Sequence, residues 1–323
     1  MGRGLNTHAR RKGAARPALL IALALILTGA VSRAAGAAPW SLRGTGIQTK
    51  PIPVPVRFRE VRGRGLIVKA WVNNSGPYDF AVDTGAGATI LSRRVAAEAR
   101  VSVSTAGAVS LSGLSGRRGA AAREATVRSF SVGDERNVLP ARGLFIVADS
   151  LPEDLDGVLD PTECYHPLGY VINFTTKTLR AFDPRQSPLR LSDEPPSGAV
   201  VAWLTENDSR RPFVMLGGGR RALVDTGSGF GLAVTEQSAR SLGIPTARGR
   251  EREGVRDLGR GQVDASRIRP ATVQIGPLAL RGVPTDLLTG AAPEAPVLLG
   301  RDALRPFELT FDPVNHLIRF APR

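Results

Sequence analysis

The chain of 323 residues suits one large domain or two modest ones, and its apolar fraction of 42% is enough to bury a core. The 36 glycines and 24 prolines imply many turns, which favours strands over long helices. The single cysteine excludes an internal disulfide, and the three histidines form no zinc-binding pattern. We therefore expect a β-rich protein without a metal or an organic cofactor.

The net charge of +14 comes partly from the N-terminus. Residues 1–37 contain six basic residues and no acid, and without them the chain has 37 basic and 29 acidic residues, or +8. The basic residues are scattered, and no platform of aromatic and basic side chains accompanies them. We therefore expect a solvated positive surface and no nucleic-acid partner. A preference for acidic substrates or for anionic envelope surfaces stays open.

Residues 1–37 have the composition of an export signal. Basic residues at 10–16 precede an apolar run of fourteen residues at 18–31, which is short for a membrane span. The small residues 35–37 then offer a cleavage site. We expect an exported protein, periplasmic or secreted, with no stable membrane insertion beyond this signal. An uncleaved N-terminal membrane anchor is the alternative.

Serine or cysteine hydrolase chemistry finds no support in the sequence. Its general base would have to be His166 or His316, because His8 lies in the expected signal. Neither histidine lies in a nucleophile motif, and no Gly-x-Ser-x-Gly elbow is present.

The most informative feature is an internal repeat. The Asp-Thr-Gly triplet at 83–85 recurs 142 residues later at 225–227. Short apolar runs precede both triplets, at 80–82 and 222–224, as expected for a buried strand that delivers an aspartate to a turn. A single Asp-Thr-Gly arises readily by chance in glycine-rich loops, but a second copy with matching flanks does not.

Further elements follow each triplet in the same order. The expected helices open with an N-cap residue, and Gly243 closes the second one. Polar turns join the last two strands of each copy into a hairpin. The repeated elements are short helices at 92–99 and 235–242, apolar segments at 156–160 and 296–300, and β-hairpins at 171–182 and 309–320.

The chain is therefore two copies of one β-rich unit, joined by a proline-rich linker. Because one chain carries both half-sites, we expect it to act as a monomer. The expected organisation is a signal peptide at 1–37, an extended segment at 38–56, a first lobe at 57–183, a linker at 184–198 and a second lobe at 199–323.

Two such units around a local twofold axis would bring Asp83 and Asp225 together. Two like charges at close range cannot both ionise cheaply, so the pair shares one proton and titrates as a unit. The ionised member can take a proton from a bound water, and the protonated member can donate to a substrate carbonyl oxygen. Repeated aspartates in this arrangement predict hydrolysis that needs no cofactor.

These motifs resemble the pepsin–retropepsin superfamily of aspartic proteases over about 265 residues. Segment 82–88 resembles the retropepsin form of the active-site loop, and segment 224–229 is closer to the pepsin form. Segment 298–302 resembles the ψ-loop that packs behind the catalytic loop, with a retropepsin-like Arg301 after the glycine. The duplication is most similar to bacterial exported retropepsin-like proteins. The resemblance implies an all-β bilobal fold with short helices, a cleft between the lobes and a polypeptide substrate.

The expected site combines a catalytic pair with the loops that support it. Each threonine of the triplets can hydrogen-bond across to the partner loop, and each glycine permits a tight turn and a close approach. The residues are Asp83 and Asp225 as the catalytic pair, Thr84, Gly85, Thr226, Gly227 and Ser228 as active-site loop support, and Leu159, Asp160, Leu299 and Gly300 in the ψ-loop.

One asymmetry separates the two active-site loops. Ser228 could donate a hydrogen bond to the Asp225 carboxylate, whereas Ala86, in the matching place, cannot. A donor to the charged form lowers the pKa of a carboxyl group. We therefore expect Asp225 to be the ionised partner and Asp83 to carry the proton.

Two regions depart from the family pattern. Asp160 stands where the first ψ-loop should have a glycine. A buried third acid would perturb the pair, and we expect this side chain to turn to solvent or to cap a turn. The flap candidates are segments 111–119 and 252–261, and the first lacks the tyrosine of the pepsin pattern.

Three functions are compatible with these observations. The first is an aspartic endopeptidase that works outside the cytoplasm. The second is a catalytically weak or inactive peptide-binding protein of the same fold, which Asp160 and the flap without tyrosine would suit. The third is an unrelated β-rich envelope protein. The intact aspartates and threonines of both triplets favour the first.

Overall fold

The computed structural model describes residues 51–149, 151–152, 154–206, 209–247, 249–256 and 261–323. The expected signal at 1–37 and most of the extended segment at 38–56 lie outside the described residues. Residues 51–55 have no regular structure and lead into the first strand, β1 (Val56–Arg57). None of the described helices is long and apolar enough to cross a membrane.

The first lobe is built on a sheet of ten strands. They are β2 (Arg59–Val61), β3 (Gly65–Val72), β4 (Ser75–Val82), β5 (Thr89–Ser92), β6 (Ser102–Val103), β7 (Val109–Ser112), β8 (Arg118–Thr126), β9 (Phe130–Val132), β10 (Phe145–Ala148) and β11 (Gly157–Leu159). The main path is β2-β3-β4-β11-β5-β10-β8-β6, with β7 paired to β8 and β9 paired to β3.

The second lobe is built on a sheet of eight strands. They are β15 (Leu204–Glu206), β16 (Ser209–Met215), β17 (Arg221–Asp225), β18 (Leu232–Thr235), β19 (Arg250–Arg256), β20 (Gln262–Ile275), β21 (Leu278–Thr289) and β22 (Val297–Gly300). Their order is β15-β16-β17-β22-β18-β21-β20-β19.

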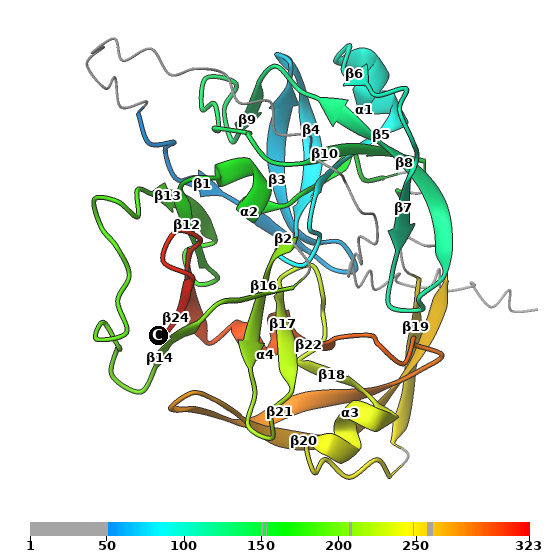
Figure 1. Cartoon of the computed structure of the whole chain (residues 1–323), viewed down its shortest axis with the longest axis vertical. Coiled ribbons are helices and arrows are strands. Elements are labelled where there is room, and N and C mark those ends of the chain that lie inside the picture. The colour runs from blue at the N-terminus through cyan, green and yellow to red at the C-terminus, as the bar shows by residue number, and fades with distance from the viewer. Residues whose placement is uncertain (1–50, 150, 153, 207–208, 248, 257–260) are drawn as a thin grey trace, which may run out of the picture.

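A third sheet joins the lobes along one side of the molecule (Figure 1). Besides β1 it contains β12 (Gly169–Asn173), β13 (Thr178–Phe182), β14 (Ala199–Ala202), β23 (Phe307–Asp312) and β24 (Leu317–Pro322). The order β1-β13-β12-β23-β24-β14 places the last hairpin of each half side by side. The predicted hairpins are therefore confirmed, and the structure adds that they form one sheet.

Both lobes repeat the same strand pairing around their aspartate. In the first lobe β11 runs parallel to β4 and antiparallel to β5, and β5 runs parallel to β10. In the second lobe β22 runs parallel to β17 and antiparallel to β18, and β18 runs parallel to β21. The all-β, two-lobed fold is confirmed, because the sequence repeat is also a repeat of topology.

The four described helices are short: α1 (Arg93–Glu98), α2 (Pro161–Tyr165), α3 (Glu236–Ser241) and α4 (Arg301–Leu304). The predicted helices are confirmed as α1 and α3. Ser92 caps α1 by accepting from the Val95 amide at 3.2 Å, and Thr235 caps α3 by accepting from the Ser238 amide at 3.2 Å. Gly243 follows α3 with a φ of +65°, a conformation that favours glycine.

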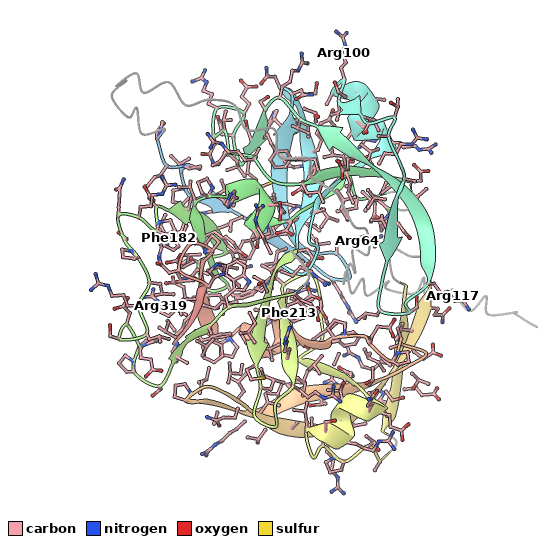
Figure 2. All side chains as sticks on the ribbon, viewed as in Figure 1. Arg64, Arg100, Arg117, Phe182, Phe213 and Arg319 are labelled. Atoms are coloured by element: carbon pink, nitrogen blue, oxygen red, sulfur yellow. The ribbon has the colours of Figure 1, made fainter. Side chains whose placement is uncertain are left out.

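Basic side chains lie on the outside of both lobes. Arg100 and Arg117 of the first lobe are exposed, and Figure 2 shows them far apart, with Arg100 at the top and Arg117 at the right edge. Their separation agrees with scattered, solvated charge.

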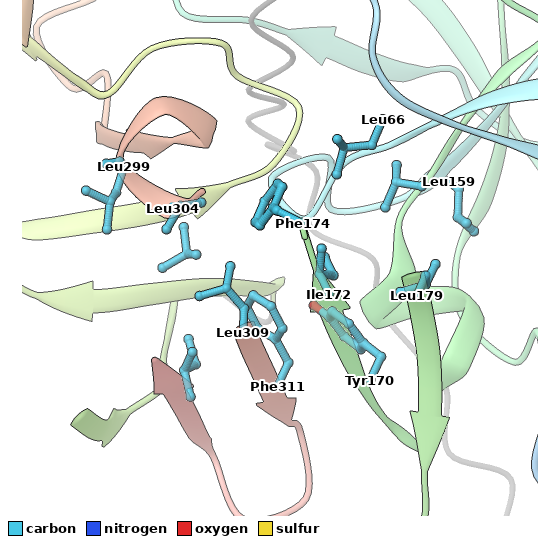
Figure 3. Close-up of a cluster of buried hydrophobic side chains, with 14 of the residues drawn as sticks. Leu66, Leu159, Tyr170, Ile172, Phe174, Leu179, Leu299, Leu304, Leu309 and Phe311 are labelled. Atoms are coloured by element: carbon cyan, nitrogen blue, oxygen red, sulfur yellow. The ribbon is translucent and has the colours of Figure 1, made fainter. Parts of the chain in front are cut away.

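The core crosses the boundary between the halves through β12 and β23. These strands pair antiparallel, with Tyr170 opposite Phe311 and Ile172 opposite Leu309. The rings of Tyr170 and Phe311 stack with their centroids 4.6 Å apart (Figure 3). Trp203 meets Phe311 edge-on at 6.0 Å. One apolar cluster therefore stabilises both halves at once.

We predict that Phe311→Ala destabilises the whole protein by about 3–5 kcal/mol, because it removes a fully buried ring shared by both halves. Urea unfolding followed by intrinsic fluorescence measures this cost. Val314→Ala, at a side chain that is 42% exposed, is the control and should change stability by less than about 0.5 kcal/mol. Equal effects of the two substitutions would contradict the shared core.

Candidate active site

Each Asp-Thr-Gly triplet lies at the end of a central strand. Asp83 directly follows β4, and its amide donates to the Leu159 carbonyl at 2.9 Å. Asp225 is the last residue of β17 and lies opposite Gly300 in β22. Neither aspartate has exposed surface. The apolar runs before the triplets therefore deliver both acids into the interior, where the lobes meet.

Thr84 and Thr226 join the two catalytic loops by four hydrogen bonds. The Thr84 hydroxyl donates to the Val224 carbonyl at 2.5 Å, and the Thr226 hydroxyl donates to the Val82 carbonyl at 3.2 Å. Each hydroxyl also accepts from the opposite threonine's amide, at 3.0 Å for the Thr226 amide and 3.2 Å for the Thr84 amide. Residues 142 positions apart are thus joined symmetrically, as the sequence predicted for this residue type.

The glycines of the triplets lie against the opposite aspartates. A Cβ atom on Gly85 would lie 2.9 Å from Cγ of Asp225, and one on Gly227 would lie 2.3 Å from Cγ of Asp83. Neither glycine has a positive φ. Glycine is therefore required here because of space, and the tight turn that the sequence suggested is the lesser reason.

In each carboxylate one oxygen accepts a hydrogen bond from a backbone amide and the other does not. Oδ1 of Asp83 accepts from the Gly85 amide at 2.8 Å, and Oδ1 of Asp225 accepts from the Ser228 amide at 3.0 Å. Oδ2 of both residues is buried and accepts no hydrogen bond from an amide, hydroxyl or cationic group in the described part of the chain. Two buried carboxyl groups in contact cannot both be charged, so these oxygens are suited to share a proton.

The surroundings distinguish the two acids. Burial raises the pKa of Asp83 well above its ordinary value, and the charge of Asp225 raises it further. Burial also raises the pKa of Asp225, but the hydrogen bond from Asp83, the Ser228 amide and the Arg301 cation all lower it. The groups that stabilise a charge on Asp225 therefore favour the proton on Asp83.

Ser228 acts through a different atom from the one the sequence suggested. Its backbone amide, rather than its hydroxyl, donates to Asp225. The hydroxyl accepts from the Phe230 amide at 3.3 Å and so shapes the loop after the triplet. The surroundings of Asp225 favour the predicted direction of the asymmetry, but the groups responsible are the Ser228 amide and Arg301, and not the Ser228 hydroxyl.

The supporting role of Arg301 follows only from the structure. Its guanidinium donates to the Thr226 carbonyl at 2.6 Å and to the Gly227 carbonyl at 2.8 Å. Gly300 before it has no room for a side chain, since a Cβ atom would lie 2.4 Å from the Phe230 carbonyl oxygen. The sequence resemblance identified an arginine after this glycine and so pointed to Arg301. The contacts of its guanidinium could not be predicted from the sequence.

The structure decides between the two alternatives expected for Asp160, a side chain turned to solvent and a side chain that caps a turn. The side chain does not turn to solvent, because the residue is only 1% exposed. Instead Oδ1 caps α2 by accepting from the amides of Thr162 at 2.8 Å and Glu163 at 3.4 Å. Leu159 and Leu299, the other ψ-loop residues, are fully buried behind the triplets. A third acid is therefore buried in the first lobe.

Both flap candidates lie in hairpins. Strands β7 and β8 enclose segment 113–117, and β19 pairs with β20, although residues 257–260 lie outside the described part. The first hairpin reaches toward the second lobe (Figure 1), where the Leu114 carbonyl accepts from the Ala292 amide at 2.8 Å. Leu114 is fully buried among apolar side chains that otherwise come from the second lobe. This hairpin therefore spans the gap between the lobes.

Among the described residues, no group of three or more histidine, cysteine, aspartate or glutamate side chains could hold a metal ion. The chemistry that these residues offer is proton transfer between two buried carboxyls.

Comparison with known families separates the chain into the same two halves. Residues 68–159 match the family described as aspartyl protease, and residues 217–306 match the family described as "gag-polyprotein putative aspartyl protease". The first match contains the triplet at 83–85 and ends at Leu159, and the second contains the triplet at 225–227 together with Leu299 and Gly300. No curated protein matches the chain.

We predict that Thr226→Val lowers the free energy of unfolding by about 1–3 kcal/mol, because it leaves the buried Thr84 amide and Val82 carbonyl without their partner. Chemical denaturation measures the change. Thr176→Val, on an exposed turn, is the matched control and should have little effect. A cost for Thr226→Val no larger than the control's would show that the threonine bonds do not hold the lobes together.

Proposed function

Because the chain belongs to the retropepsin-like aspartyl protease family, we propose that it is an active endopeptidase with Asp83 and Asp225 as its catalytic pair. The observation that carries the proposal is the contact of two fully buried carboxyls with different electrostatic surroundings at the junction of the lobes. Buried acids of this kind are costly for stability and are characteristic of catalytic sites.

The proposed reaction uses the two carboxyls in different roles. Ionised Asp225 takes a proton from a water molecule, and the water oxygen attacks the carbonyl carbon of the peptide bond. Asp83 donates its proton to the carbonyl oxygen, which gives a neutral tetrahedral diol. The proton held by Asp225 then passes to the amide nitrogen as the carbon–nitrogen bond breaks. Asp83 recovers its proton from the diol, so both residues return to their starting states.

The loops supply the rigidity that this proton transfer needs. The threonine bonds fix the two turns relative to each other, and Arg301 holds two carbonyls of the second turn. A fixed pair loses little free energy to reorganisation as charge moves in the transition state. The site is thus pre-organised before substrate arrives.

Substrate entry requires movement, because neither aspartate has exposed surface. The hairpin of β7 and β8 is the element that crosses to the second lobe, through Leu114 and the Ala292 amide. We propose that this hairpin lifts to admit a polypeptide and closes over it. Closure then excludes water and strengthens the electrostatic contacts around the pair.

We further propose that the protein works as an exported monomer. The basic and apolar segments of residues 1–37 support export to the periplasm or beyond, with an N-terminal membrane anchor as the alternative. Both half-sites lie on one chain and are joined by the shared sheet. A weakly active or inactive peptide-binding protein is the second candidate, favoured by the burial of Asp160 beside the pair.

We predict that Asp83→Asn and Asp225→Asn each lower the rate of casein hydrolysis by roughly 10²- to 10⁴-fold, because each removes one proton-transfer step. Asp134→Asn, on an exposed turn, is the control and should leave the rate unchanged. A statine-containing peptide should inhibit the wild type. Binding of that peptide without any hydrolysis between pH 3 and 8 would favour the peptide-binding alternative.

We predict that Arg301→Met moves the acid limb of the rate–pH profile to higher pH, by roughly one unit. The Arg301 cation lowers the pKa of Asp225, so without it Asp225 becomes protonated sooner as the pH falls and activity is lost earlier. Arg301→Lys keeps the charge and should keep the limb closer to its wild-type position.

Ser228→Ala keeps the backbone amide that binds Asp225, so its acid limb should stay near that of the wild type. A larger shift for Ser228→Ala than for Arg301→Met would show that the hydroxyl, and not the cation, sets the charge of Asp225.

A further inference from the structure

The two lobes differ at one position directly behind the catalytic loops. In the first lobe Leu159 lies opposite Val82, and in the second lobe Leu299 lies opposite Val224. The residues that follow, Asp160 and Gly300, therefore occupy equivalent places. One lobe has a carboxyl group where the other has no side chain.

The second lobe excludes a side chain at this place and uses the next residue instead. The carbonyl oxygens of Ser228 and Phe230 lie so close to Gly300 that they occupy the space of a Cβ atom. Arg301 then reaches the catalytic loop with its guanidinium. In the first lobe Pro161 stands in the place of Arg301 and has no donor to offer.

The first lobe is built around the Asp160 carboxyl. Its Oδ1 accepts from the amides of Thr162 and Glu163, and the Gly87 amide also interacts with the carboxylate. The Asp160 amide donates to the hydroxyl of Thr89 at 3.2 Å, at the start of β5. Asp160 therefore connects α2 to the segment that directly follows the first Asp-Thr-Gly triplet.

The electrostatic surroundings of Asp160 are mostly acidic. Burial raises the pKa of Asp160 to about 8 and the charge of Glu163 contributes, while the amides of Thr162, Glu163 and Gly87 lower it. The titratable and charged groups that interact with Asp160 are Asp83 after β4, Glu163 and Cys164 on α2, Tyr170 on β12 and Arg211 on β16. Glu163 is itself paired with Arg210 at 3.0 Å.

We propose, on the basis of the proposed function, that Asp160 is a positioning residue for Asp83. Its carboxyl holds the loop behind Asp83, and, once ionised, its charge opposes loss of the proton that the catalytic pair shares. The lobes thus place opposite influences behind the two aspartates, the cation of Arg301 behind Asp225 and the acid of Asp160 behind Asp83.

The expected pH dependence follows from the interaction of three carboxyls. The pair is active while it holds one proton, and loss of that proton sets the alkaline limb. Asp160 becomes charged as the pH approaches about 8, and this charge raises the pKa of Asp83 and so opposes the loss. Without Asp160 the pair should lose its proton, and the protein its activity, at lower pH.

The first test compares Asp160→Asn with the wild type in the hydrolysis of labelled casein below its KM. The asparagine oxygen can still accept from the Thr162 amide, but the side chain cannot ionise. We expect the alkaline limb to move to lower pH by roughly half a unit to one unit. Asp160→Gly, which copies the second lobe, should show the same shift together with a lower melting temperature. An unchanged limb in both variants would overturn the inference.

Asp312→Asn is the matched control. Asp312 is fully buried and likewise accepts from backbone amides, those of Leu189 and Val314, but it lies at the end of β23. This substitution should lower stability without moving the alkaline limb. A shift as large as that of Asp160→Asn would show that any buried aspartate perturbs the profile, and would overturn the specific role of Asp160.

A second measurement does not depend on hydrolysis. With a pKa of about 8 in the folded protein against 3.8 for an ordinary aspartate, Asp160 binds its proton more tightly in the folded state. Its contribution to stability is therefore full below pH 3.8 and is lost as the pH rises to about 8. The melting temperature of the wild type, minus that of Asp160→Asn, should fall across this range.

The two proposals can fail separately. If no form of the protein cleaves casein or binds a statine-containing peptide, the proposed function fails, while the melting difference still shows whether Asp160 is a buried, protonated acid. If the wild type cleaves casein and Asp83→Asn does not, but Asp160→Asn leaves both the alkaline limb and the melting difference unchanged, only the role of Asp160 is overturned.

Discussion

The structure depends on placing two acidic side chains against each other in the interior. Burial and mutual repulsion both oppose ionisation, so the arrangement is tolerable only while one carboxyl keeps its proton. The threonine bonds and the two triplet glycines bring the acids together and prevent them from moving apart. The apolar strands on either side then bury the pair, and this burial raises the pKa of both acids.

The shared sheet explains how the lobes tolerate this repulsion. Pairing of β12 with β23 joins the halves by backbone hydrogen bonds, and Tyr170 stacks on Phe311 across the same boundary. Separation of the lobes would expose this core as well as break the threonine bonds. The first-lobe hairpin meets the second lobe through Leu114 and its hydrogen bond with the Ala292 amide, so the proposed opening and closing is assigned to the hairpin and not to the lobes.

Much of the site could be predicted from the sequence because its motifs occur in both halves of the chain. The triplets, the capped helices and the terminal hairpins all recur at similar spacing, and each recurrence supports the other. The burial of Asp160 could not be predicted from the sequence, because it depends on how α2 and the loop at 86–89 pack around this residue. The roles of the Ser228 amide and of Arg301 also escaped sequence reasoning, since backbone donors and the reach of a guanidinium leave no pattern of residue types.

The difference between Asp160 and Gly300 has an evolutionary consequence. In an assembly of two identical chains, one gene change alters both halves, so a new acid would appear behind both catalytic carboxyls. Covalent fusion of the halves removes that restriction. The descendant copies can then diverge, and one half can specialise in holding the proton while the other specialises in releasing it.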